Sequence, residues 1–168
     1  YDRVIFSLDN GNELRFNDTR KFGKLHVTKN PEEILGELGP EPLDPNLSPE
    51  KFAALFTART GALKPLLLNQ SFIAGLGNIY VDEVLWRSKL NPKRKAESLK
   101  PPDHELLFDS IKVILKRAIV SQGTDFGDGV VPGGGYSPRV YGRDGRPCFR
   151  CKTPISRSVV GQRGTHFC

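Results

Sequence analysis

Apolar and polar residues alternate with a period of two at the start of the chain. Apolar residues occupy every second position from Val4 to Leu8, and they return at Leu14 and Phe16. This period places successive side chains on opposite faces of a strand, so the pattern predicts a β-hairpin with one apolar face. A three-residue loop over residues 10–12 is expected, because it places Leu8 opposite Leu14 on that face.

Helical periods begin further along the chain. The segment Ser48-Pro49-Glu50 combines an N-cap residue, a proline suited to the first turn and an acidic first turn, which predicts the start of a helix. Shorter helices are expected over 32–38, 65–73 and 79–88. A longer helix is expected to begin with Asp103 as its cap and to bury one apolar stripe. The members of that stripe are Leu107, Ile111, Ile114, Leu115 and Ala118.

Proline and glycine divide these elements into an α+β chain of four parts. Residues 1–28 hold the hairpin and a short returning strand, and the proline-rich residues 29–47 form a linker. Residues 48–138 are expected to be helical and to end in a glycine-rich loop, 121–138, that has no periodicity. Loops of this length are usually functional or disordered. Residues 139–168 form a basic module that contains all three cysteines.

A glycine-rich turn precedes the helix expected over 79–88. Gly75 and Gly77 can adopt positive φ, and Asn78 is a favoured N-cap whose neighbouring backbone amides point outward. A helix start of this kind suits an anion such as phosphate. The two glycines also fit a plain tight turn between helices, which Gly-x-Gly by itself favours.

The net charge of +6 is concentrated in the last thirty residues. Residues 139–168 contain seven basic residues and one acidic residue, and the rest of the chain is balanced. A local excess of positive charge is expected of a surface that meets a polyanion, and a solvated basic face has the same composition. No apolar run is long enough to span a bilayer, and the first residues lack the form of a signal peptide. We therefore expect a soluble, intracellular protein.

The cysteine spacing fits a zinc ribbon. Cys148 and Cys151 form a Cys-x₂-Cys pair, and Cys168 follows after sixteen intervening residues. Zinc ribbons use two such pairs about 15 to 20 residues apart, so a fourth cysteine ligand is expected three residues beyond Cys168. His166 is a poor substitute, because a strand would point it to the same face as its near neighbour Cys168. Unpaired buried cysteines, or a disulfide in a secreted protein, are the other interpretations.

The segment between the cysteines is expected to form a hairpin. Its first strand would contain Ile155 and Val159-Val160 and its second strand residues 165–167, joined by the turn Gly161-Gln162-Arg163-Gly164. Arg163 would then lie at the tip, where a guanidinium can hold a phosphate with two hydrogen bonds.

Four motifs occur in a fixed order along the chain. They are Asp18-x-Arg20-x-Phe22-Gly23, residues 70–83 with Gly-x-Gly-Asn-Ile-Tyr-x-Asp-Glu, residues 140–148 with Val-Tyr-Gly-Arg-x-Gly-x-Pro-Cys, and residues 161–168 with Gly-x-Arg-Gly-Thr-x-Phe-Cys. Together they resemble the formamidopyrimidine-DNA glycosylase family, over about the later two thirds of such an enzyme. The resemblance implies that 1–28 end an N-terminal β-sandwich domain, that 48–138 form a helix-two-turns-helix domain, and that 139–168 form a truncated zinc finger.

The resemblance implies that the chain binds duplex DNA containing oxidised bases or abasic sites. The residues expected to hold phosphates around the lesion are Lys64, Asn78, Tyr141 and Arg163. Arg20 and Phe22 are expected to enter the duplex where the damaged base is flipped out, since an inserted aromatic ring recovers part of the lost stacking. Arginine has only donors, which suits the acceptor-bearing edge of the unpaired cytosine. Periodicity alone leaves Phe22 equally able to fold into the core of the hairpin.

The resemblance further implies a bifunctional DNA glycosylase and AP lyase of base excision repair, acting in the cytoplasm on the nucleoid. Such enzymes remove oxidised purines, such as 8-oxoguanine and formamidopyrimidines, and residues 121–138 resemble that group. The family's nucleophile is an N-terminal proline, followed by glutamate, that forms a Schiff base; neither residue is in this chain. We therefore expect a monomer that binds DNA without cutting it. Asp82 and Glu83 are candidate paired acids, but the dipole at a helix start explains them better.

Two other functions fit parts of the sequence. A non-catalytic, zinc-containing nucleic-acid-binding module would reuse the helical turn and the zinc ribbon. A purely structural zinc site with incidental charge would give an affinity for DNA that hardly changes with salt. Several phosphate contacts would instead make the affinity fall steeply as salt rises.

Overall fold

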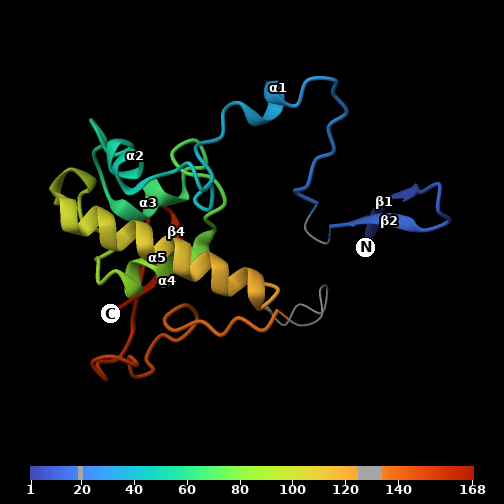
Figure 1. The fold of residues 1–168 in the computed structure, drawn as a ribbon. Helices are drawn as coiled ribbons and strands as arrows, with labels where there is room; N and C mark the ends of the chain where they lie inside the picture. Colours follow the sequence, from blue (N-terminus) through green and yellow to red (C-terminus); the bar gives the residue numbers. More distant parts are fainter. Residues whose placement is uncertain (19–20, 125–133) are drawn as a thin grey trace.

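The computed structural model describes residues 1–18, 21–124 and 134–168, and it combines helices with two small antiparallel sheets (Figure 1). The elements in chain order are β1 (Asp2–Ser7), β2 (Glu13–Asn17), α1 (Glu32–Leu35), α2 (Pro49–Ala54), α3 (Leu63–Leu68), α4 (Asn78–Arg87), the 3₁₀ turn η1 (Ala96–Ser98), α5 (Pro101–Val120), β3 (Ser156–Val160) and β4 (Arg163–Phe167). This mixture confirms the α+β class expected from the sequence. None of the helices in these residues has the length and apolar character needed to cross a membrane.

Strands β1 and β2 form the expected hairpin, but the predicted register is wrong. Leu14 lies opposite Phe6 and not opposite Leu8, because the three-residue loop begins one residue earlier than predicted. The third position of such a loop commonly needs positive φ, and the observed loop places Gly11 there, with a φ of 80°. The predicted loop would have placed Asn12 at that position, so the backbone freedom of glycine decides the register.

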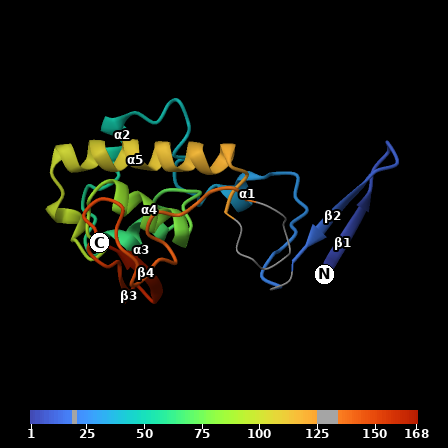
Figure 2. The same ribbon diagram turned by 90° about the horizontal axis from the view of Figure 1, so that it is seen from below.

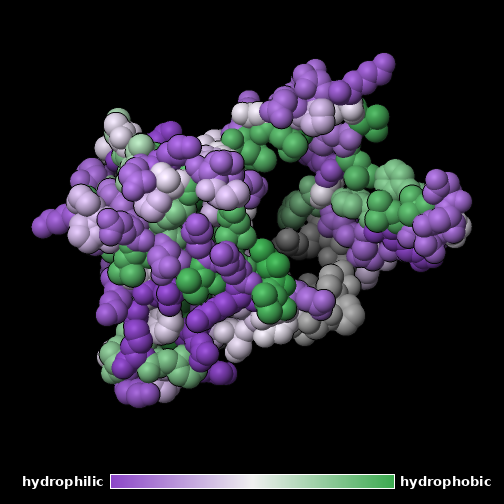
Figure 3. Space-filling view, in the orientation of Figure 1, coloured by the Kyte–Doolittle hydropathy of each residue, from purple (hydrophilic) through white to green (hydrophobic). Residues whose placement is uncertain are grey.

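The β1–β2 hairpin lies apart from the helical body in two perpendicular views (Figures 1 and 2). Hydrophobic side chains form part of its surface (Figure 3), and Leu14 keeps 60% of its surface exposed. Residues 24–28, expected as a third strand, are irregular, and Val27 is fully exposed. A single hairpin thus presents an apolar face that no other strand of the described residues covers.

Helices α2 and α5 carry the start signals that the sequence indicates. The hydroxyl of Ser48 accepts a hydrogen bond from the backbone N–H of Lys51 (3.3 Å), as expected of an N-cap. Helix α5 begins at Pro101, before the predicted cap, because proline suits the first helical position. Asp103 is therefore the third helical residue, and its carboxylate accepts the N–H of Lys100 (2.9 Å).

Two shorter helices have other bounds than predicted. Helix α1 ends at Leu35 and not at residue 38. It buries none of its residues, so tertiary packing does not stabilise a longer helix. Helix α3 begins two residues earlier and ends five residues earlier than the expected 65–73. It ends where Asn69 becomes extended and its side chain accepts the N–H of Ser71 (3.0 Å), which competes with helix continuation.

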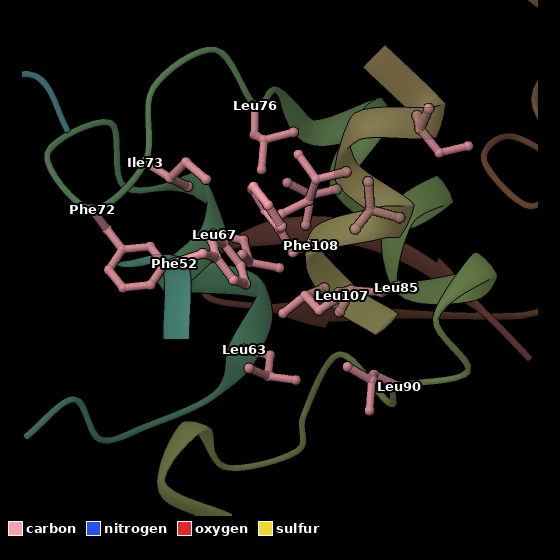
Figure 4. Packing of buried hydrophobic residues seen from close by; sticks show 14 of the residues in the cluster. Phe52, Leu63, Leu67, Phe72, Ile73, Leu76, Leu85, Leu90, Leu107 and Phe108 are labelled. Atoms are coloured by element: carbon pink, nitrogen blue, oxygen red, sulfur yellow. The ribbon is translucent and has the colours of Figure 1, made fainter. Parts of the chain in front are cut away.

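Helices α2 to α5 enclose the main apolar core (Figure 4). The predicted stripe of α5 faces this core, with Leu115 only partly buried and Phe108 as an additional member. The ring of Phe108 stacks on that of Phe52 in α2, with centroids 4.9 Å apart. Phe56 and Phe72 meet edge-on at 5.0 Å. The same core includes buried residues of α3 and α4, the helices on either side of the glycine-rich turn.

Strands β3 and β4 form the expected C-terminal hairpin, and β4 packs against α4 (Figures 1 and 2). Its turn has two residues, Gly161 and Gln162, both with positive φ, so Arg163 begins β4 and does not form the predicted tip. A Cβ atom on Gly161 would lie 2.4 Å from Cγ of Pro65. The turn therefore packs against α3 at a distance that only glycine allows.

Candidate nucleic-acid interface

Three of the four residues expected to hold phosphates line one cavity. Asn78 at the start of α4, Tyr141 after the glycine-rich loop and Arg163 at the start of β4 border a cavity of about 590 Å³. The rest of its wall consists of Leu68, Gln70, Leu76, Gly77, Ile79 and Tyr80. An amide, a phenol and a guanidinium all offer hydrogen-bond donors, so the cavity can receive an oxyanion such as a phosphate.

The glycine-rich turn before α4 is held by Gln70. Its Nε2 donates to the carbonyl of Leu76 (3.0 Å), and its Oε1 accepts the N–H of Gly75 (3.0 Å). Gly75 has a φ of 78°, whereas Gly77 has a φ of −101°. Both glycines can adopt positive φ, but only Gly75 does so in this turn.

The side chain of Asn78 faces the β3–β4 hairpin. Its Nδ2 donates to the carbonyl of Gly164 (3.3 Å), and the N-cap of α4 is Gly77, so the prediction that Asn78 caps the helix is wrong. Its Oδ1 is buried and has no hydrogen-bond partner among the described residues. An amide nitrogen carries two N–H groups, so Nδ2 can also donate to a ligand in the cavity.

Lys64, the fourth expected phosphate ligand, has no exposed surface. Its ammonium lies 2.6 Å from Oδ1 of Asp82 and donates to the carbonyl of Gly164 (2.8 Å). Burial lowers the pKa of Lys64 and raises the pKa of Asp82, and the ion pair offsets part of each shift. The expected direct contact with a phosphate is not possible in this arrangement, because protein atoms enclose the ammonium. Lys64 instead fixes the backbone next to Arg163.

Glu83 is fully buried and accepts hydrogen bonds from three consecutive backbone N–H groups. These belong to Arg139 (2.7 Å), Val140 (2.8 Å) and Tyr141 (2.9 Å). The hydroxyl of Tyr136 donates to the same carboxylate (3.3 Å), and burial, with the nearby charge of Glu83, raises the pKa of Tyr136. Glu83 therefore holds the segment after the glycine-rich loop against α4.

His166 is buried next to two carboxylates. Its backbone N–H donates to Oδ2 of Asp82 (2.8 Å), and its Nδ1 lies 3.5 Å from the same oxygen. Its Nε2 lies 3.5 Å from Oδ1 of Asp144, and its ring meets that of Tyr141 edge-on at 4.9 Å. His166 thus links β4 to α4 through Asp82, and it is not a member of the cysteine cluster.

Cys148, Cys151 and Cys168 lie together. Their Sγ atoms are within 4.8 Å of one another, and all three are free thiols. The indole Nε1 of Trp86 and the N–H of Arg150 donate to Sγ of Cys148, at 3.3 Å and 3.4 Å. Thiolates around a tetrahedral zinc ion are close neighbours of this kind, so the three residues fit one zinc site.

The thiols of this cluster differ widely in pKa. Burial alone would raise the pKa of Cys148, but hydrogen bonds from neighbouring N–H groups lower it to about 6. The pKa of Cys168 is raised to about 12, first because its thiol hydrogen-bonds to Cys151. Thiolates this close repel one another, and a divalent cation is the group that stabilises several of them at once. The chemistry of the three donors therefore suits zinc.

The two residues expected to enter the duplex differ in what the structure describes. Phe22 is 77% exposed, so its ring is not folded into the core of the hairpin. Arg20 lies outside the described residues, as do residues 125–133 of the glycine-rich loop. At the start of that loop, the hydroxyls of Thr124 and Tyr80 lie 3.3 Å apart, which ties the loop to α4.

Sequence reasoning missed the roles of Asp82 and Glu83. It assigned both to the dipole of a helix start, but α4 begins at Asn78, and both acids are buried beyond its first turn. A signal was available, because both acids interrupt an apolar helical run over 79–86. Buried carboxylates are paired or hydrogen-bonded, so acids in such a run indicate polar partners from elsewhere in the chain.

Comparison with known proteins gives one family. The sequence profile of the formamidopyrimidine-DNA glycosylase H2TH domain matches residues 38–128. The formamidopyrimidine-DNA glycosylase of Protochlamydia amoebophila is 42% identical over 181 residues, and that of Herpetosiphon aurantiacus is 43% identical over 175 residues. Both alignments cover 100% of this chain and 64% of the relative, so the chain spans less than two thirds of these curated relatives.

Solved structures show the same fold. The crystal structure of MutM (Fpg) from Thermus thermophilus matches with a TM-score of 0.88 and 37% identity, over 99% of this chain and 66% of that chain. The Lactococcus lactis enzyme, non-covalently bound to DNA containing an AP site, matches with a TM-score of 0.83 and 37% identity. That match covers 93% of this chain and 60% of the other.

Proposed function

The chain belongs to the formamidopyrimidine-DNA glycosylase family, and on that basis we propose that it is the DNA-binding part of a base-excision-repair enzyme. The whole protein would be a bifunctional DNA glycosylase and AP lyase that removes oxidised purines through a Schiff base. The observation that carries this proposal is the cavity in which Asn78, Tyr141 and Arg163 meet. The DNA-bound Lactococcus relative supports duplex DNA with a damaged or abasic site as the partner.

In the proposed complex, Asn78, Tyr141 and Arg163 donate hydrogen bonds to phosphates around the lesion. Arg163 is the charged residue among the described residues of the cavity wall. Hydrogen bonds between charged groups are stronger than neutral ones, so Arg163 contributes most of the affinity from this cavity. Lys64 acts indirectly, because it holds the carbonyl of Gly164 beside Arg163.

Arg20 and Phe22 are proposed to occupy the space that the flipped base leaves. The exposed ring of Phe22 would stack on the neighbouring base pair and recover part of the cost of flipping. The donors of Arg20 would hydrogen-bond the acceptor-bearing edge of the unpaired cytosine. These two residues would give discrimination, whereas the phosphate contacts give affinity.

We propose one structural zinc ion on Cys148, Cys151 and Cys168, with a fourth cysteine outside these 168 residues. Zinc bound there would stabilise the fold and would take no part in the reaction. Cys168 directly follows β4, so the ion would also support the strand that begins with Arg163.

The division of the chain is proposed as the end of a β-sandwich domain (1–28), a linker (29–47), a helix-two-turns-helix domain (48–138) and a zinc finger (139–168). The shared core of α2 to α5 supports the helical unit. The exposed apolar face of the β1–β2 hairpin supports its membership of a larger sheet. The assembly is proposed to act on DNA as a monomer.

We predict that the 168-residue chain binds damaged duplex without cutting it. It should bind a duplex carrying a tetrahydrofuran abasic analogue opposite cytosine more tightly than the intact duplex, measured by fluorescence anisotropy. Borohydride treatment with a true abasic duplex should give no covalent adduct, because the family's proline nucleophile has no counterpart in this chain. An adduct would show that the chain contains a nucleophile. Equal affinity for both duplexes would favour the non-catalytic nucleic-acid-binding module.

A further inference from the structure

Asp82 holds the strand that carries Arg163. Its Oδ2 accepts the N–H of His166 (2.8 Å), and its Oδ1 pairs with Lys64 (2.6 Å). Lys64 in turn donates to the carbonyl of Gly164 (2.8 Å). Strand β4 is therefore held against α4 at Gly164 and His166, one and three residues beyond Arg163, through the fully buried side chains of Lys64 and Asp82. The guanidinium itself remains exposed at the cavity.

Glu83, the next residue of α4, holds a different segment. Its four described donors are the hydroxyl of Tyr136 and the backbone N–H groups of Arg139, Val140 and Tyr141. These donors share no member with the described partners of Asp82, although the two sets touch where the ring of Tyr141 meets that of His166. Adjacent positions on one helix point about 100° apart, which explains how neighbouring acids reach separate segments.

We propose that Asp82 and Glu83 are positioning residues that set two phosphate contacts through separate hydrogen bonds, Asp82 for Arg163 and Glu83 for Tyr141. Neither acid touches the DNA; each fixes the backbone that aims a donor into the cavity. Helix α4 thus supplies Asn78 directly and controls the other two donors through its two acids. This inference rests on the proposed function.

Carboxylates are needed at both positions because both oxygens of each acid accept hydrogen bonds. Oε1 of Glu83 accepts from Val140 and Tyr141, and Oε2 accepts from Arg139. Glutamine would keep one oxygen and turn an NH₂ group toward backbone N–H donors. Asparagine in place of Asp82 would likewise leave either the ammonium of Lys64 or a backbone N–H facing another donor.

The proposal is tested by double-mutant cycles on the affinity for the tetrahydrofuran duplex. Tyr141→Phe should weaken binding about fivefold in the wild-type background, as expected for one hydrogen bond, and less than about twofold in the Glu83→Gln background. Arg163→Ala should weaken binding equally in the wild-type and Glu83→Gln backgrounds. In the Asp82→Asn background, the effect of Arg163→Ala should shrink and the effect of Tyr141→Phe should persist.

Combining each acid variant with each donor variant separates a positioning role from general destabilisation. A merely structural role would give either additive effects in all four cycles or the same coupling in all four, and both results would overturn the proposal. Failure of the wild-type chain to bind any duplex would overturn the proposed function instead. Thermal unfolding shows whether each variant is folded. If the Glu83→Gln variant is not folded, Glu83→Asp replaces it, because the shorter side chain withdraws the carboxylate from the backbone N–H groups and keeps the charge. The cycles with Asp82 and the cycles with Glu83 each test their own half of the proposal.

Discussion

Replacing Arg163 with alanine is expected to weaken duplex binding by about 10- to 100-fold, for damaged and intact DNA alike. A hydrogen bond to a charged group contributes about 1.5–3 kcal/mol, and Arg163 is the cation of the cavity that Asn78 and Tyr141 share with it. Losing one phosphate contact should also lower the slope of log K against log salt by about one. Fluorescence anisotropy titrations at several salt concentrations measure both quantities.

A second arginine of the same hairpin provides the control. Arg157 is exposed on β3, and it does not line the cavity, so Arg157→Ala should have a much smaller effect on affinity. Asn78→Ala should resemble Arg163→Ala in weakening both duplexes. Arg20→Ala should instead reduce discrimination of the base opposite the lesion. Loss of discrimination alone in Arg163→Ala would contradict this division of roles.

Replacing Lys64 with alanine is expected to destabilise the fold by about 3–5 kcal/mol, because it leaves a buried carboxylate without its cation. Both side chains of the Lys64–Asp82 pair are fully buried, and the ammonium also satisfies the carbonyl of Gly164. Urea unfolding monitored by circular dichroism gives the change in free energy of unfolding.

An exposed ion pair serves as the matched control for Lys64→Ala. The guanidinium of Arg87 lies 3.0 Å from Asp109, and the two side chains are 34% and 59% exposed. Exposed pairs contribute about 0–1 kcal/mol, so Arg87→Ala should change the free energy of unfolding far less. Similar effects of the two substitutions would contradict the claim that the buried Lys64–Asp82 pair holds β4 against α4.

Local signals predicted the fold where local chemistry decides it. Ser48 caps α2 as expected, and the apolar stripe from Leu107 to Ala118 faces the core. The hairpin register was predicted wrongly because it depends on which loop residue adopts positive φ, and that residue is Gly11. The start of α5 was misplaced because Pro101 fits the first helical position better than Asp103 fits the cap.

The sequence indicated which donors line the cavity, but it did not indicate the buried hydrogen bonds and ion pair behind them. Asn78, Tyr141 and Arg163, which the family resemblance named, line one cavity, and their contacts with phosphate stay a prediction. The environment of Lys64 could not be read from its neighbours, since its partners lie 18 and 100 residues away along the chain. Glu83 likewise finds its partners 53 to 58 residues further on. Such contacts depend on tertiary packing, which a local pattern of apolar and polar residues does not specify.

The most direct test of the central claim is the affinity of the wild-type chain for the tetrahydrofuran duplex as a function of salt. If the cavity and the basic C-terminal residues bind phosphates, log K should fall linearly with log salt, by about 0.9 for each phosphate charge neutralised. We predict a slope well above one in magnitude, with tighter binding to the abasic analogue than to intact duplex at every salt concentration. An affinity that is weak and nearly indifferent to salt would contradict the claim.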